Sequence, residues 1–144
     1  FLIELRGDRQ SEFYQAGADV MGIKVTLDPR ALGRLWEAAK KAAVMTAEAL
    51  HGDLVSSQTM PYNVGTMQND NTFTDMQDDG DAFTASIITD SPQARRLYFH
   101  PEYNFQKTNN PNAGGEWLEP YIGGEKQDFA EEKFAGFMKE EIGK

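Results

Sequence analysis

The chain has 144 residues, of which 40% are hydrophobic and 26% are charged, and this balance predicts one globular domain with a single core. Its 14 basic and 23 acidic residues give a net charge of −9, and no Lys or Arg occurs from residue 42 to residue 94. An acidic segment of that length repels phosphate, which argues against tight DNA binding. No apolar run is long enough to cross a bilayer, and the lack of cysteine excludes disulfides and thiolate metal sites.

The beginning of the chain differs from the rest. Met21-Gly-Ile-Lys-Val is typical of a natural start, so residues 1–20 are interpreted as an extension and residues 21–144 as one domain. A short strand over residues 2–5 is the alternative interpretation of the first residues. Apolar and polar residues alternate over residues 23–27, which predicts a further short strand.

A long helix is predicted next. Asp28 and Pro29 mark its start, because Asp caps free amide groups and Pro has no amide hydrogen to leave unpaired at the first position. Apolar and alanine residues then recur at helical spacing as far as Leu54, which predicts one buried face. Pro61 cannot continue a helix and marks the turn that follows.

A β-hairpin and a second helix complete the predicted elements. Residues 72–76 and 82–89 alternate in polarity around an Asp-Gly turn, which is typical of two antiparallel strands. Apolar residues recur at helical spacing from Phe129 to Ile142. The predicted fold class is therefore α+β, in which a long N-terminal helix and a C-terminal helix pack on a small antiparallel β-sheet containing the hairpin.

The predicted hairpin carries a group of acidic side chains. These are Asp75, Asp78, Asp79 and Asp81. Asp75, Gln77 and Asp79 precede Gly80 with the spacing of the first half of an EF-hand loop. Ser86, however, stands where the closing Glu of such a loop belongs. Strands rather than helices flank the motif, so we interpret the segment as a solvated turn and not as a metal site.

Residues 95–120, which we call the aromatic loop, contain five aromatic residues, three prolines, four asparagines and a Gly-Gly pair. Composition leaves two interpretations open. One is a surface loop pinned to the core by its aromatic side chains, and the other is an ordered loop that docks onto another protein. For docking, the predicted contact residues are Tyr98, Phe99, His100, Tyr103, Phe105 and Trp117.

The sequence contains little that suggests catalysis. The two histidines, His51 and His100, lack partners at metal-ligand spacing, and His100 has only Glu102 nearby. The sequence has no Gly-rich phosphate loop, no HExxH motif and no nucleophile elbow. We therefore expect no enzyme, no cofactor and no metal.

The order of these segments resembles a family of phage proteins. The segment from Pro61 to Met67 is similar to the turn that follows the long helix in the head–tail joining and tail-completion proteins named after the tenth gene product of phage HK97, although Asn63-Val64 replaces the Asp-Thr usual there. Residues 97–117 are typical of the minor capsid or neck proteins of tailed bacteriophages of Gram-positive hosts. The resemblance covers residues 21–144.

The resemblance implies a structural virion protein with a small antiparallel sheet backed by helices. Such a protein forms a ring, a hexamer or dodecamer, at the head–tail neck after assembly in the host cytoplasm. Its partners are then its own copies, a portal, adaptor or stopper protein, and a tail tube or terminator protein. DNA passes through the ring without specific binding, no membrane is involved, and the acidic hairpin lies towards the lumen or the tail face.

Two alternatives remain open. One is a neighbouring role in the same particle, as a tail terminator or a head-completion stopper. The other is a module that binds a carbohydrate or another ligand through exposed aromatic side chains.

Overall fold

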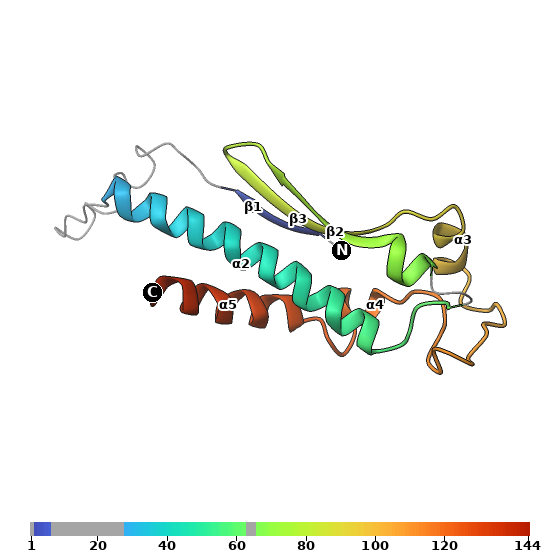
Figure 1. Ribbon diagram of the computed structural model, residues 1–144. Coiled ribbons are helices and arrows are strands. Elements are labelled where there is room, and N and C mark those ends of the chain that lie inside the picture. The colour runs from blue at the N-terminus through green and yellow to red at the C-terminus, as the bar shows by residue number, and fades with distance from the viewer. Residues whose placement is uncertain (1, 7–27, 63–65) are drawn as a thin grey trace.

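A long helix, α2 (Pro29–Ser56), runs along the molecule in the computed structural model, which describes residues 2–6, 28–62 and 66–144 (Figure 1). The Asp28 carboxylate accepts a hydrogen bond from the backbone amide of Arg30 at 3.0 Å, and Pro29 lies in the first turn. The predicted start of the helix is confirmed. Gly52 lies within α2 and does not end it.

One face of α2 is buried and consists mostly of small side chains. The hydroxyl of Thr46 donates a hydrogen bond to the Ala42 carbonyl at 2.6 Å, so this buried polar group has a partner. Small side chains allow neighbouring elements to approach the helix closely. The buried residues of α2 are Ala38, Ala42, Ala43, Thr46, Ala47, Leu50 and Leu54.

The strands β2 (Thr72–Asp78) and β3 (Ala82–Thr89) form the predicted hairpin, which is confirmed. Gly80 has a φ of 88°, a backbone conformation that suits glycine, and it lies in the tight turn between the strands. Alternate residues of β3 are buried against α2. These are Phe83, Ala85 and Ile87.

A third strand, β1 (Leu2–Arg6), pairs antiparallel with β3, so the strand order is β1-β3-β2. The alternative of a strand at the beginning of the chain is thus confirmed for these residues. Residue 1 and residues 7–20 of the hypothesised extension, together with the predicted strand of residues 23–27, lie outside the described residues.

The C-terminal helix α5 (Phe129–Ile142) packs along α2, and α2 lies between α5 and the sheet in Figure 1. Phe134 of α5 packs against the cluster of buried residues that joins α2 to Phe83 and Ala85 of β3. Near the end of α5, a carboxylate oxygen of Glu141 lies 3.8 Å from Lys41 Nζ of α2. The predicted α+β class is confirmed: α2 packs directly on the small antiparallel sheet, and α5 packs along α2 and reaches the core shared with β3 through Phe134.

Three short elements connect these parts: η2 (Thr66–Asp70), α3 (Ala94–Tyr98) and α4 (Glu119–Ile122). They surround a second cluster of buried residues at the end of α2. Its members are Leu50, Leu54, Met60, Ile87, Trp117 and Tyr121. Within the described ranges, no helix is long and apolar enough to cross a membrane.

Candidate interaction surface

The aromatic loop lies beyond the end of α2, where polar contacts fix it to the turn that follows the helix (Figure 1). Asn110 is buried, and its amide donates hydrogen bonds to the Met60 carbonyl at 2.8 Å and to Gln68 Oε1 at 2.7 Å. The amide of Asn112 donates to the Ser57 carbonyl at 3.0 Å. Buried polar groups need such partners, so this loop has a defined path.

The aromatic loop passes close to the backbone of α3 at Gly115, and this close approach requires a glycine. A Cβ atom on Gly115 would lie 2.9 Å from the carbonyl oxygens of Leu97 and Tyr98. The next amide, that of Glu116, donates to the same Tyr98 carbonyl at 2.9 Å. The close approach of two backbone segments therefore fixes the position of Trp117.

Trp117 belongs to the core and not to the surface. It is only 4% exposed and lies edge-to-face with Tyr98 at a centroid distance of 4.9 Å. The prediction that Trp117 is a docking residue is therefore wrong, because the side chain fills the space beside Leu50 and Leu54. Trp117 instead anchors the aromatic loop to the core, as expected for a surface loop that is pinned by its aromatic side chains.

Tyr98 and Phe105 are half-buried. The Tyr98 hydroxyl donates a hydrogen bond to Glu119 Oε1 at 3.1 Å. Burial, followed by this contact with Glu119, raises the pKa of Tyr98 to about 12. Tyr98 is therefore neutral at physiological pH, and it joins α3 to α4.

Phe99 and Tyr103 are the exposed aromatic residues of the loop, at 63% and 42% exposure. The ring of His100 stacks on Tyr103 with centroids 4.7 Å apart and an interplanar angle of 6°. His100 Nδ1 lies 2.7 Å from Glu102 Oε1, and this contact lowers the pKa of the Glu102 carboxyl. His100 thus contacts both Tyr103 and Glu102, while Tyr103 stays partly exposed.

A shallow depression of about 520 Å³ lies beside Phe99. The exposed guanidinium groups of Arg95 and Arg96 line it, together with one proline and one histidine. We call this the Arg–Phe surface, and its members are Pro92, Arg95, Arg96, Phe99 and His100.

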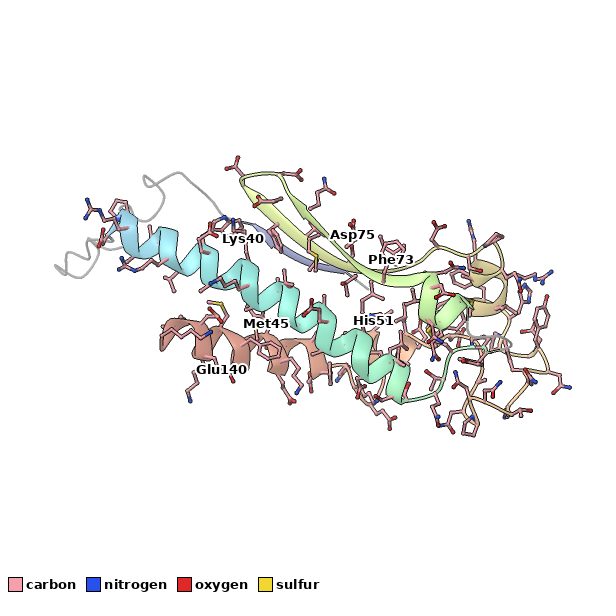
Figure 2. All side chains as sticks on the ribbon, viewed as in Figure 1. Lys40, Met45, His51, Phe73, Asp75 and Glu140 are labelled. Carbon is pink, nitrogen blue, oxygen red and sulfur yellow. The ribbon has the colours of Figure 1, made fainter. Side chains whose placement is uncertain are left out.

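The acidic residues of the hairpin divide into two places. Asp75 lies on β2 opposite Ser86, on the face of the sheet away from α2 (Figure 2). The other three lie at the turn, which we call the acidic hairpin tip: Asp78, Asp79 and Asp81.

Local contacts organise the acidic hairpin tip. The Asp78 carboxylate accepts hydrogen bonds from the Gly80 amide at 2.9 Å and from Lys40 Nζ at 3.2 Å. The hydrogen bonds that Lys40 donates, first to Glu37 and then to Asp78, raise the pKa of Lys40. Gln77 donates to Asp79 at 3.1 Å. The tip is thus an ordered, exposed turn, and Lys40 contacts its negative charge at Asp78.

Candidate metal ligands are dispersed. In the described parts of the chain, no group of three or more His, Cys, Asp or Glu side chains could hold a metal ion. His51 lies on α2, and its Nε2 atom is buried without a hydrogen-bond partner among these residues. His100 lies on the aromatic loop and contacts Glu102 instead.

One polar cluster was not predicted from sequence. Asp53 Oδ2 accepts hydrogen bonds from the Tyr121 hydroxyl at 2.6 Å and from Lys126 Nζ at 2.7 Å. Burial alone raises the pKa of Asp53, but the hydrogen bonds from Lys126 and Tyr121 outweigh burial and lower it. The partners are far apart in sequence, so no local pattern could have indicated this link between α2 and α4.

No known protein family, curated protein or solved structure matches this chain. The resemblance to phage neck proteins, and the partners that it implies, therefore remain predictions. The described surface itself offers two kinds of contact: aromatic and cationic groups on the Arg–Phe surface, and carboxylates at the acidic hairpin tip. Both suit binding to another macromolecule.

Proposed function

We propose that this chain is a structural virion protein that forms a ring at the head–tail neck of a tailed bacteriophage. The observation that carries the proposal is the exposure of Phe99 and Tyr103 on a loop whose path is otherwise fixed by buried contacts. A fixed loop loses little conformational freedom when it binds, so exposed aromatic groups on it are suited to docking. The resemblance over residues 21–144 supplies the identity of the particle.

In this proposal the copies associate head to tail, through different surfaces of each copy, and close into a hexamer or dodecamer. One side of the ring contacts a portal, adaptor or stopper protein, and the other contacts a tail tube or terminator protein. The chain assembles in the host cytoplasm and resides in the virion. The exposure of charged and aromatic groups at different places on the molecule supports association of this kind.

DNA passes through the proposed ring without specific binding. The net charge of −9 and the exposed carboxylates of the acidic hairpin tip support this part of the proposal. A channel wall that gains nothing from counterion release does not retain phosphate. The acidic residues are expected towards the lumen or the tail face of the ring.

The test uses the purified full chain, examined by light scattering and negative-stain electron microscopy. The wild type is expected to form rings, and the double variant Phe99→Ala/Tyr103→Ala is expected to remain monomeric. Its free energy of unfolding should stay within about 0.5 kcal/mol of the wild type, because both side chains are exposed. Phe73→Ala is the matched control, since Phe73 is 41% exposed but lies on β2.

Two results would contradict the proposal. A wild-type chain that stays monomeric and is retained on a carbohydrate column would favour the ligand-binding alternative. Rings that persist in the double variant would exclude the exposed aromatic pair as the contact. Rings that bind a tail or stopper component alone would instead assign the neighbouring role in the same particle.

A further inference from the structure

The strand β2 forms an open edge of the sheet. In the described part of the chain β3 lies in the middle, so β1 and β2 each have one side without a neighbouring strand. Proteins commonly protect such edges with lysine, proline, a bulge or a short strand. The edge at β2 has none of these, because β2 pairs with β3 without interruption over seven residues and contains neither lysine nor proline. This edge is therefore suited to pairing with a further strand.

The hydrogen-bond pattern of the hairpin shows which main-chain groups face the open edge. The Asp79 amide donates to the Ala82 carbonyl at 2.9 Å, so this pair belongs to the hydrogen-bonded type. In an antiparallel ladder, pairs of this type alternate with pairs that exchange no hydrogen bonds. The odd-numbered residues of β2 therefore bond to β3. The amides and carbonyls of Thr74 and Met76 point away from β3, towards the open edge.

The strand β1 forms the other open edge, on the opposite side of β3 (Figure 1). The same alternation directs the main-chain groups of Ile3 and Leu5 to β3 and those of Glu4 away from it. Both outer strands run antiparallel to β3, so β1 and β2 are parallel to each other. One copy of the chain thus has two different open edges that face in opposite directions.

We propose that the β2 edge of one copy pairs with the β1 edge of a second copy, so that the sheet continues from subunit to subunit. The inference rests on the proposed ring and names a main-chain contact between its copies. Thr74 and Met76 exchange hydrogen bonds with the main chain around Glu4 of the second copy. Two different edges give a head-to-tail contact, which closes into a ring when the rotation between copies permits. Closure leaves no edge open.

Charge favours β1 over a second β2 as the added strand. Asp75 is the central residue of β2, and β2 contains no basic residue. Full antiparallel pairing of two β2 strands would place the two Asp75 residues opposite each other, and like charges in that position destabilise a sheet. β1 contains one acidic and one basic residue, so its net charge is zero. Main-chain groups make the contact, and Phe73→Ala, the control for the exposed aromatic pair, retains all of them.

Proline substitution provides the first test, measured by sedimentation velocity of the full chain. Met76→Pro and Glu4→Pro each remove an amide that points away from β3, a position where an edge strand tolerates proline. The reference variants are Met76→Ala and Glu4→Ala, which remove the same side chains and keep the amides. Each proline variant should associate at least about tenfold more weakly than its alanine reference, because a carbonyl of the other copy loses its donor.

A mixture of the two proline variants tests whether the contact is head to tail. Met76→Pro retains an intact β1 edge, and Glu4→Pro retains an intact β2 edge. Their equimolar mixture should form heterodimers and stop at two copies, because both remaining edges are blocked. Pairing of β2 with β2 would instead let Glu4→Pro associate without its partner variant, and that result would overturn the inference.

Hydrogen exchange provides a second test that requires no substitution. Exchange of single amides is compared in the wild type below and above the concentration at which the chain assembles. The amides of Thr74 and Met76 should exchange at least about tenfold more slowly after assembly, since each gains a hydrogen bond. The amides of Asp75 and Gln77 are the internal control, because they already bond to β3 in the single copy.

The outcomes separate this inference from the proposed function. A wild type that assembles without slower exchange at Thr74 and Met76 overturns the inference and leaves the ring intact. Proline variants that associate as tightly as their alanine references do the same. A wild type that does not assemble at all removes the ring and this contact together.

Discussion

Gly115 illustrates how a single residue fixes the aromatic loop. A Cβ atom there would meet two carbonyl oxygens at 2.9 Å and the Cα of Pro101 at 3.0 Å. All three are backbone atoms, which cannot move aside as a flexible side chain does. We therefore expect Gly115→Ala to lower the free energy of unfolding by about 2 kcal/mol. Urea denaturation of the purified chain measures this change.

The preceding residue is the matched control. A Cβ atom on Gly114 would find its nearest neighbour, the Asn112 carbonyl oxygen, at 4.0 Å, which is an ordinary contact. Gly114→Ala should therefore change stability by less than about 0.5 kcal/mol. Equal effects at the two glycines would show that the close approach beneath α3 does not limit stability.

The side chains of the aromatic loop differ in burial, and the sequence alone could not predict which of them are buried. Composition left two interpretations open, a loop pinned to the core and a loop that docks onto another protein, and the structure has Trp117 buried and Phe99 exposed. The difference depends on the backbone path set by Asn110 and Gly115, whose partners lie in α3 and after α2. Side-chain burial in a loop is a tertiary property, and no periodicity reveals it.

At the scale of elements, those with strong local signals were predicted correctly. The cap and proline of α2, the Asp-Gly turn of the hairpin and the apolar spacing of α5 each determine structure within a few residues. The short helices were harder to predict. The residues that precede α3 and α4, Gln93 and Leu118, make no side-chain cap, so tertiary packing selects these helices.

The contact between α2 and α4 makes a prediction about pH. Asp53 accepts hydrogen bonds from Tyr121 and Lys126, and its side chain is 32% exposed, so solvent weakens the ion pair. We expect Asp53→Asn to lower the free energy of unfolding by about 1 kcal/mol at pH 7. Urea denaturation of both proteins between pH 7 and pH 3 measures the difference.

The direction of the pH effect follows from the lowered pKa. The usual pKa of the Asp53 carboxyl is 3.8, and the folded-state pKa is lower. Its contribution to stability is therefore complete above the usual value and disappears as the pH falls through the lowered one. The advantage of the wild type should shrink below about pH 4. Asp90→Asn is the control, because Asp90 is exposed, and a similar pH-dependent loss there would exclude a specific role for Asp53.

At the scale of the whole molecule, charge is unevenly distributed. The net charge of −9 makes copies repel one another, whereas in the proposed ring the two arginines of the Arg–Phe surface attract acidic groups of the neighbouring copy. Salt screens both effects, since the Debye length falls from about 10 Å at 0.1 M to about 3 Å at 1 M. A rise in salt therefore weakens both the repulsion and the attraction between wild-type copies, and these have opposite effects on association. A comparison between variants is needed to separate them.

Neutral substitutions separate attraction from repulsion. Arg95→Gln/Arg96→Gln removes the attraction and raises the net negative charge from −9 to −11, so we expect its association to strengthen as salt rises. At low salt the wild type should associate at least about tenfold more tightly, and this ratio should approach one at about 1 M NaCl. Phe99→Ala removes apolar contact without changing charge, so its ratio to the wild type should hardly depend on salt. A ratio for the arginine variant that is equally independent of salt would mean that these side chains contribute through packing, because an attraction between charges must weaken when ions screen it.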